Sequence, residues 1–473
     1  MANTHFLLRS LLVFSVIALL LSPLSIGQKR AEDVKENTNI SISQLENYNL
    51  LIIAPDEFVD TLQPLVVHKN QMGMKTVLVS LATVYDEMFW HGRDEPEKIK
   101  YFIKQAYDSW GITYVMLVGD FRKMPVRYVH NQDVLQGFNE PVFISELYYA
   151  DINNSSGSFS SWDTDNDGIF GEWIDDGVAT SAEDKNIDLY PDVYVGRLAC
   201  RNTIEVKTMV NKIITYETET YGSDWFNRVI VCAGDTYLES DNPEWVGSEG
   251  ERNTMRVLEN MSGFDHVKLW TSDGSFTGVK DIIREMNQGA GFVYFDGHAN
   301  PYHWSTHPPN EHTWINGLSI VTMSLLKNGG KLPVVVVGGC HNLQFDVHLG
   351  KLAEDPWYLY TWIPECWGWK LTRTIGGGSI ATIGCTGLGM TSEDKFDGEK
   401  GAGDYLEPTF FYEYGVNNTR YLGECWGNAI TDYLHAFPVN WNTPAARNDA
   451  IDTKTVQQWT LLGDPSLLIG GYP

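Results

Sequence analysis

The chain has 473 residues, and its 61 acidic side chains against 34 basic ones give a formal net charge of −27. Hydrophobic residues make up 43% of it, with 16 Trp and 23 Tyr, which is too much apolar and aromatic material for a disordered protein. The excess of acid argues against nucleic acid and anionic membrane surfaces as partners, because both are bound through Lys and Arg.

The N-terminus has the pattern of an export signal. Arg9 precedes the apolar run LLVFSVIALLLSPLSIG, which is short for a membrane span and is interrupted by Ser22 and Pro23. We therefore expect residues 1–27 to be a secretory signal peptide, with an uncleaved anchor as the alternative. Residues 28–46 are polar and aperiodic, and we expect a linker or short pro-segment there. The mature protein is expected to be secreted and soluble.

Two α/β subdomains are predicted along the rest of the chain. From residue 47 onward, apolar strand-like runs alternate with segments of helical spacing, which is typical of parallel sheets covered by helices. We assign residues 47–222 to an N-terminal subdomain and residues 223–473 to a second one. The runs expected to be strands are NLLIIAP, KTVLVSL, TYVMLVGD and PDVYVGRLA in the first, then RVIVCAGD, HVKLWT, GFVYFDGH, LPVVVVGGC and GSIATIGC in the second.

An acidic loop in the first subdomain has the spacing of calcium ligands. The segment DTDNDGIFGE places carboxylates at alternate positions before a glycine, which permits a tight turn around a hard cation. Ile174 stands where an EF-hand has its closing Glu, so the closing ligand differs. We expect a structural calcium ion here and no organic cofactor; the alternative is a solvated acidic loop. The expected ligands are Asp163, Asp165, Asp167 and Glu172, with Asp175 and Asp176 as other candidates for the closing ligand.

Two strands of the second subdomain end in reactive side chains. GFVYFDGH ends at His298, and LPVVVVGGC ends at Cys340. Ligands collect at the carboxyl ends of strands in doubly wound sheets. A thiolate at such a place is a nucleophile, and a nearby imidazole supplies or accepts its proton. The pair therefore favours nucleophilic catalysis; the alternative is a buried inert cysteine and a hydrogen-bonded core histidine.

A metal-dependent hydrolase is the competing chemistry. The segment HANPYHWSTHPPNEH contains His298, His303, His307 and His312. It has no H-E-x-x-H motif, however, and its prolines prevent the continuous helix that would align the ligands. The six cysteines form no C-x-x-C pair, which argues against a zinc ribbon or a thioredoxin motif. We expect this histidine-rich segment to be a loop at a substrate cleft.

The ordered motifs of the chain resemble gingipain-type cysteine peptidases, family C25 of clan CD. The resemblance runs from about Tyr48 to Ile469 and implies a caspase-like three-layer α/β/α sandwich with mostly parallel sheets. It also implies a cysteine endopeptidase that acts on proteins or peptides. The motifs are FVYFDGH, LPVVVVGGCHNLQFD, GGGSIATIGCT and TLLGDPSLLI, with YVMLVGDFRKMP and PDVYVGRLACRNTIEVKTMVNKIITYE in the first subdomain.

The resemblance assigns roles to individual residues. Cys340 matches the family nucleophile, and His298 matches the catalytic histidine. Asp235 falls where the family has an acid, usually Glu, that supports the histidine. The oxyanion hole would consist of the backbone N–H groups of Cys340 and Ala299. The family usually has Gly-His-Gly where this chain has Ala299, so an inactive exported binding protein on the same fold is the alternative.

Substrate preference is left open by the sequence. Gingipains select Arg or Lys at P1, the residue before the scissile bond, with an acid and an aromatic wall. Glu249 and Glu251 are both candidates for that acid. The segment GLGMTSEDKFDGEK, which corresponds to the wall, lacks the Trp of an Arg-specific relative. A basic P1 residue is therefore one expectation, and the sequence predicts no oligomeric state.

Overall fold

The computed structural model describes residues 47–132, 140–174, 178–241, 247–350, 363–390, 401–445 and 448–473. The predicted signal peptide (1–27) and linker (28–46) lie outside the described residues, and so do Asp175 and Asp176. Residues 41–473 belong to one compact unit. Among the described helices, none combines the length and the apolar character that a membrane crossing requires. The subdomain boundary at residue 222 stays a prediction.

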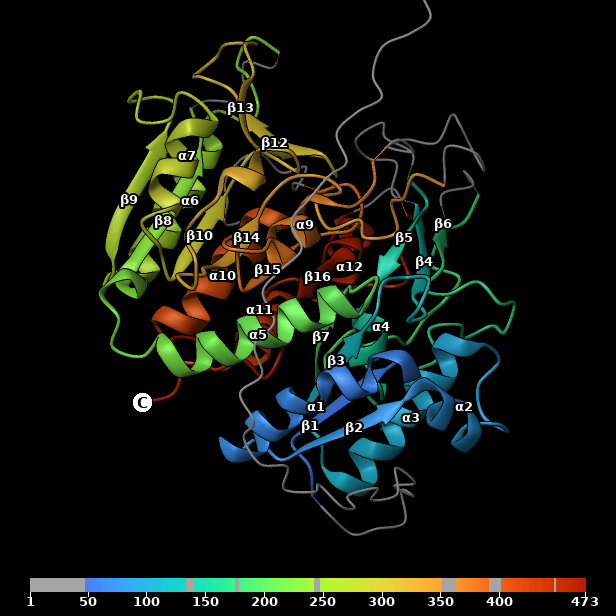
Figure 1. Cartoon of the computed structure of the whole chain (residues 1–473). Coiled ribbons are helices and arrows are strands. Elements are labelled where there is room, and N and C mark those ends of the chain that lie inside the picture. Colours follow the sequence, from blue (N-terminus) through green and yellow to red (C-terminus); the bar gives the residue numbers. More distant parts are fainter. Residues whose placement is uncertain are drawn as a thin grey trace, which may run out of the picture. The chain divides into compact units, whose positions relative to one another are not determined.

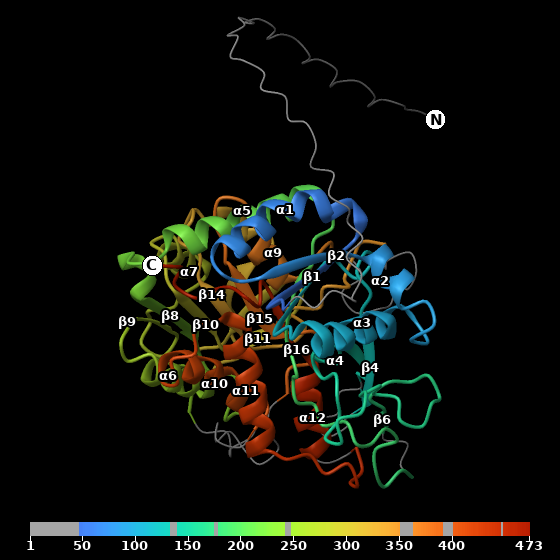
Figure 2. The same ribbon diagram turned by 90° about the horizontal axis from the view of Figure 1, so that it is seen from below.

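The first sheet is parallel throughout and is built from the N-terminal part of the chain. Its strands in the described residues follow the order β2-β1-β3-β7 (Figure 1). Figure 2 shows α1 and α5 on one face of this sheet and α3 on the other. The bounds are β1 (Leu50–Ala54), α1 (Asp56–Gln71), β2 (Thr76–Ser80), α2 (Leu81–Glu87), α3 (Glu95–Trp110), β3 (Tyr114–Val118), α4 (Leu147–Ala150), β7 (Tyr194–Leu198) and α5 (Thr203–Glu219).

The second sheet carries the candidate catalytic residues. In the part of the chain that is described, its strand order is β16-β15-β14-β10-β8-β9, parallel except for β16. Helices α6, α10 and α11 lie on one face and α7 and α9 on the other (Figure 2). The strands are β8 (Arg228–Ala233), β9 (Asp265–Trp270), β10 (Phe292–Phe295), β14 (Val334–Val337), β15 (Ala381–Cys385) and β16 (Trp459–Leu462). The helices are α6 (Glu249–Asn260), α7 (Val279–Met286), α9 (Trp367–Arg373), α10 (Gly403–Gly415), α11 (Leu422–Ala436) and α12 (Asn448–Gln458).

Strands β10 and β14 are apolar along their whole length because both of their faces are covered. Every residue of FVYF and VVVV is buried. A strand buried on both faces needs a continuous apolar run, which is why the sequence pattern identified these two strands. The expected α/β sandwich with mostly parallel sheets is confirmed.

Two small sheets extend from this framework. Strands β11 (His298–Ala299), β12 (His303–Thr306) and β13 (Ile315–Ser319) form an antiparallel sheet directly after β10. The histidine-rich segment, expected to be a loop, therefore contains paired strands. The second small sheet joins β4 (Arg127–Gln132), β5 (Val142–Ser145) and β6 (Trp173–Ile174), and the short 3-10 helices are η1 (Asp224–Asn227) and η2 (Thr322–Leu325).

Candidate active site

Cys340 and His298 come together because their strands are neighbours. Strands β10 and β14 pair in parallel, with Phe295 opposite Val337, so they end at the same edge of the sheet. Each candidate residue follows three positions later. Both line one cavity with about 530 Å³ of empty space. The two predicted side chains therefore line the same cavity, and their catalytic role stays a prediction.

Glycine at position 339 allows the nucleophile segment to approach β11. Gly339 has φ +120°, and a Cβ added there would lie 2.6 Å from the backbone nitrogen of Ala299. Only glycine fits a site with both that conformation and that spacing. The next residue but one, His341, has φ +54°, so the chain turns sharply around Cys340. The close approach places Cys340 beside the residues that follow His298.

The His298 ring is held by a backbone carbonyl. Its Nε2 lies 2.9 Å from the Thr236 oxygen. Because a carbonyl only accepts, Nε2 carries the proton and Nδ1 is left as the basic nitrogen. Burial lowers the pKa of His298, and the neighbouring His307 lowers it further. A backbone carbonyl gives no sequence signal, so the pattern of residue types did not indicate the role of Thr236.

Asp235 lies one residue from this carbonyl but does not bond His298 in the described residues. Its Oδ2 accepts a hydrogen bond from the Asn310 N–H at 2.5 Å. Its carboxyl group also shares a hydrogen bond with Glu249. The hydrogen-bond partner of His298 is thus Thr236 rather than the expected Asp235. The Asp235 side chain is buried, and it bonds Asn310 and Glu249 instead.

The structure separates the two candidate acids for substrate binding. Glu249, at the start of α6, lines the cavity with Cys340. Burial, followed by the nearby Asp235, raises the pKa of Glu249 to about 7. Glu251 instead accepts hydrogen bonds from the N–H of Ser272 at 3.0 Å and from its hydroxyl at 2.5 Å. Of the two candidates, Glu249 is therefore the one that lines the cavity.

Further carboxyl groups line the same cavity, and the sequence analysis did not select them. They are Asp296, Asp404 and Glu407. The Tyr294 hydroxyl lies 2.7 Å from Asp296 Oδ2 and 2.8 Å from Glu407 Oε2. One hydroxyl hydrogen cannot serve two carboxylates, and burial raises the pKa of both acids. At least one of these two carboxyl groups therefore carries a proton. The described cavity lining contains four acidic residues and no Lys or Arg, which suits a cation better than an anion.

The Cys340 thiol and the His298 imidazole are both neutral at rest. Burial raises the pKa of Cys340 to about 11, while its Sγ lies 3.9 Å from the Gly389 oxygen. Since the His298 pKa is lowered, the proton stays on the sulfur. All six cysteines of the chain are free thiols; five are fully buried, and Cys340 is partly buried.

Ala299 presents its N–H away from its partner strand. The N–H of Asn300 donates to the His303 oxygen, and His298 pairs with Ser305. Hydrogen-bonded and non-hydrogen-bonded pairs alternate along an antiparallel ladder, so Ala299 occupies a non-bonded position. Its N–H therefore points toward the side where Gly339 approaches.

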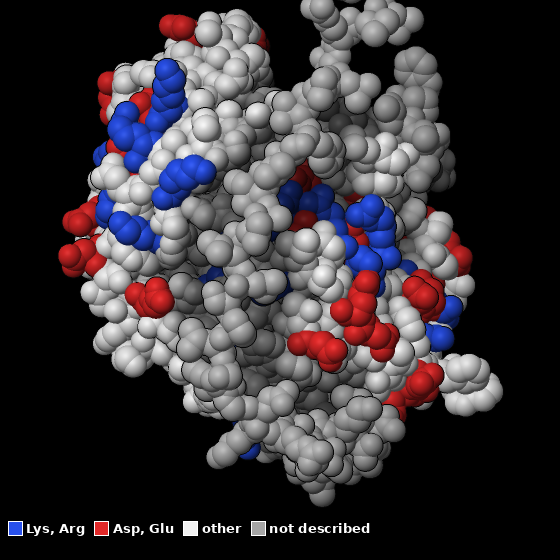
Figure 3. Space-filling model, viewed as in Figure 1, with Lys and Arg blue, Asp and Glu red and all other residues white. Residues whose placement is uncertain are grey.

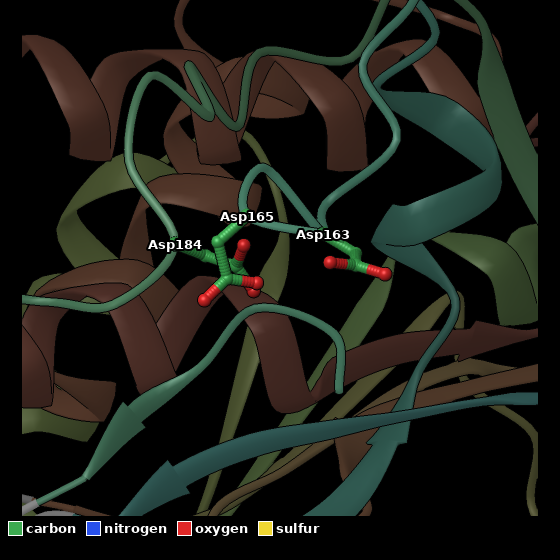
Figure 4. Close-up of side chains that lie close together, drawn as sticks. All are labelled: Asp163, Asp165 and Asp184. Carbon is green, nitrogen blue, oxygen red and sulfur yellow. The ribbon is translucent and has the colours of Figure 1, made fainter. Parts of the chain in front are cut away.

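The acidic loop brings its carboxylates together and adds one more. Asp163, Asp165 and Asp184 have carboxylate oxygens within 4.8 Å of one another (Figure 4), and Asp165, Asp167 and Glu172 form a second such group. The Asp163 carboxylate accepts hydrogen bonds from the N–H groups of Asp167 at 3.1 Å and Gly168 at 3.0 Å, and Arg93 also contacts it. Oxygen donors of this kind suit Ca²⁺. Asp184 lies outside the acidic run, so the spacing could not identify it.

The other histidines do not form a ligand cluster with these groups. The triads of metal-binding side chains found in the described part of the chain are both in the acidic loop. His307 bonds the Thr313 oxygen at 3.3 Å, and His312 is 70% exposed at its side chain. The geometry thus gives no support to the metal-hydrolase alternative.

Parallel strands that are followed by a cysteine and a histidine lining one cavity define the chain as an α/β protein built like a cysteine peptidase. Residues 43–469 match the model of Peptidase family C25, and the chain belongs to that family. The resemblance seen in the sequence motifs is thereby confirmed.

Curated relatives and solved structures agree with this assignment. Gingipain R2 from Porphyromonas gingivalis is 20% identical over 436 residues, which cover 90% of this chain and 47% of the relative. Lys-gingipain from the same species is 20% identical over 363 residues, which cover 73% of this chain and 16% of the relative. The chain thus spans less than half the length of these relatives. The crystal structure of the Arg-specific cysteine proteinase gingipain R aligns with a TM-score of 0.62 at 19% identity, covering 90% of this chain and 79% of that one.

Proposed function

We propose that the chain is a cysteine endopeptidase in which Cys340 is the nucleophile and His298 the general base and acid. The observation that carries the proposal is the single cavity that both side chains line at the ends of adjacent parallel strands. A thiol beside an imidazole in such a cavity suits acyl transfer. Membership of a peptidase family agrees with this reaction.

The reaction follows from the neutral resting pair. His298 Nδ1 accepts the thiol proton as the Cys340 sulfur attacks a peptide carbonyl. The C–N bond then breaks, and the imidazolium returns that proton to the leaving amine, which gives a thioester. Water attacks the thioester while His298 takes its proton, and the acid leaves as the thiol is restored. The Thr236 carbonyl holds the ring throughout, because it bonds the other nitrogen.

The oxyanion is assigned to the backbone N–H groups of Cys340 and Ala299. The Ala299 N–H faces away from β12, toward the Cys340 side. Alanine fits there because Ala299 has extended strand geometry and is not among the residues with positive φ. Its difference from Gly-His-Gly therefore does not require an inactive site.

A basic P1 residue is the substrate class that the cavity favours. Glu249 sits in the wall with Cys340, and Asp404 adds a second carboxylate. An ammonium or guanidinium group would form charge-assisted hydrogen bonds with these oxygens. We assign Glu249, and not Glu251, as the residue that binds this charge.

We also propose a structural calcium ion in the acidic loop and export of the mature chain. Asp163, Asp165, Asp167 and Glu172 would hold the ion, with Asp184 as a further ligand, since their oxygens gather in two overlapping groups. Calcium would neutralise their mutual repulsion and fasten the loop. Export and cleavage both rest on the signal-like segment 1–27. Retention of the protein inside the cell would contradict export, and a secreted protein whose N-terminal sequence begins at Met1 would contradict cleavage.

Cleavage of a peptide library by the wild type and by Cys340→Ala tests the enzymatic proposal. We expect the wild type to cleave after Arg or Lys, and Cys340→Ala to lose essentially all turnover. Cys200→Ala, a change at a buried thiol in the first part of the chain, is the control that retains it. Turnover by Cys340→Ala would refute the nucleophile. Folded, calcium-loaded wild type that binds peptides without cleaving any would instead favour the binding protein.

A further inference from the structure

Trp314 is an exposed aromatic side chain next to the candidate catalytic histidine. It precedes β13 and is 51% exposed. Its ring centroid lies 5.2 Å from that of His298 and 3.8 Å from that of His307. A half-exposed tryptophan leaves a large apolar surface in contact with water, which is unfavourable. Such side chains are often found where a partner or ligand covers the ring.

The buried His307 holds Trp314 in position. His307 is 6% exposed, and its ring bonds the Thr313 oxygen, the carbonyl directly before Trp314. The His307 oxygen in turn accepts the Asp235 N–H at 3.0 Å. The indole therefore rests on a buried ring that is tied to the end of β8, and it offers its remaining surface to solvent.

Trp314 contacts the His298 ring without lining the cavity. Tyr237 lines the cavity and lies 6.1 Å from the histidine ring, whereas Trp314 is not among the cavity-lining residues. If His298 protonates the leaving amine, as the proposed function requires, the substrate after the scissile bond must pass over its ring. We infer that a side chain in contact with His298 outside the cavity lining meets the residue after that bond, P1′.

We propose that Trp314 is the wall of an S1′ subsite that binds a large apolar or aromatic P1′ side chain. The proposal rests on the proposed peptidase function. Indole presents a broad, rigid apolar face, and aromatic groups prefer such faces in offset or edge-on contact. A P1′ glycine has no side chain to make this contact.

Three substrates with the same sequence up to an Arg at P1 test the subsite. Two are quenched peptides with Phe or Gly at P1′, and the third is the methyl ester, which has no P1′ residue. In Trp314→Ala we expect kcat/KM to fall by roughly tenfold for the Phe peptide, because loss of an apolar wall has about that effect on discrimination. The Gly peptide and the ester should change by less than about twofold.

Two variants control for structure. Trp90→Ala removes a tryptophan that is 89% exposed after α2 and should leave all three substrates unchanged. Trp314→Phe keeps an aromatic face and should retain the Phe preference. Equal losses on all three substrates in Trp314→Ala would overturn the proposal, because they would mean that Trp314 only positions His298. An unchanged Phe-to-Gly ratio would overturn it as well.

A binding measurement separates this proposal from the proposed function. On a Cys340→Ala background, the same peptides are titrated by fluorescence anisotropy, and no turnover is needed. We expect the Phe peptide to bind more tightly than the Gly peptide, and Trp314→Ala to remove the difference. Equal affinities before that change would overturn the S1′ assignment. Turnover by Cys340→Ala would refute the proposed function alone.

Discussion

At the scale of single residues, burial determines which groups of the candidate site carry a proton. Cys340 holds its proton because burial raises its pKa to about 11, and His298 stays neutral because burial lowers its pKa. Catalysis on this account begins with a proton transfer and not with a standing thiolate. The Thr236 carbonyl makes the transfer directional, since it leaves only Nδ1 basic.

Glu249 should make the preference for a basic P1 residue depend on pH. Its pKa, raised to about 7, leaves the carboxyl neutral in acid and charged above neutrality. The ratio of kcat/KM for Arg over its neutral isostere citrulline should therefore rise between pH 5.5 and 8. A charged hydrogen bond contributes about 1.5–3 kcal/mol, and the carboxyl is only partly titrated between these pH values, so the rise should be about 8- to 25-fold. The ratio cancels the titration of Cys340 and His298, which affects both substrates.

Glu249→Gln should make that ratio low and independent of pH. Glu251→Gln is the matched control, because Glu251 bonds Ser272 and lies outside the cavity lining. A pH-dependent ratio that persists in Glu249→Gln would assign the charge recognition to Asp404 or another cavity acid.

At the scale of elements, the sequence predicts the buried strands well and the site only in part. Continuous apolar runs identify β10 and β14, and their parallel order implies that His298 and Cys340 share an edge. The sheet β11-β12-β13 was missed because its prolines and histidines hide the alternation of a strand. Thr236 contacts His298 through its backbone carbonyl, so its residue type carries no information about this role. Asp184 lies outside the run DTDNDGIFGE, so the spacing of that run does not include it.

The acidic loop between Asp163 and Asp184 should stabilise the fold when calcium binds. A ligand at 100 times its Kd adds about 2.7 kcal/mol to the free energy of unfolding. We expect EGTA to lower the melting temperature of the wild type by several degrees and to leave Asp165→Asn unchanged. Asp165 is exposed, so its substitution should not disturb packing. Asp60→Asn, at an exposed site on α1, should respond to EGTA as the wild type does; an EGTA-insensitive wild type would contradict the calcium site.

At the scale of the whole molecule, a buried ion cluster ties the first sheet's helices to the end of the chain. Lys69 Nζ on α1 lies 2.7 Å from Glu217 Oε1 on α5 and 2.7 Å from Asp464 Oδ2, and all three side chains have no exposed surface. Asp464 of the GDPSLL motif thus contributes to the packing of the core. On the face seen in Figure 3, acidic and basic side chains are interspersed. The net charge of −27 therefore does not appear as one acidic patch on this face.

Lys69→Met should therefore destabilise the fold strongly. It leaves Asp464 buried without its cation and Glu217 paired with His68, 2.8 Å away. Breaking a buried pair in this way costs about 3–5 kcal/mol. Lys104→Met is the control, because its partner Asp108 is half exposed and such pairs contribute about 0–1 kcal/mol. Urea unfolding measures both. Similar unfolding free energies for the two variants would contradict the structural role of the cluster.

The most direct test of the central claim is to trap the acyl-enzyme. The protein is mixed with a peptide methyl ester that carries Arg at P1, quenched in acid within milliseconds to seconds, digested and analysed by mass spectrometry. We expect the mass of the acyl group on the peptide that contains Cys340, and no adduct in Cys340→Ala. Hydrolysis of the ester with no adduct on Cys340 at any quench time, or an adduct on another residue, would contradict the account.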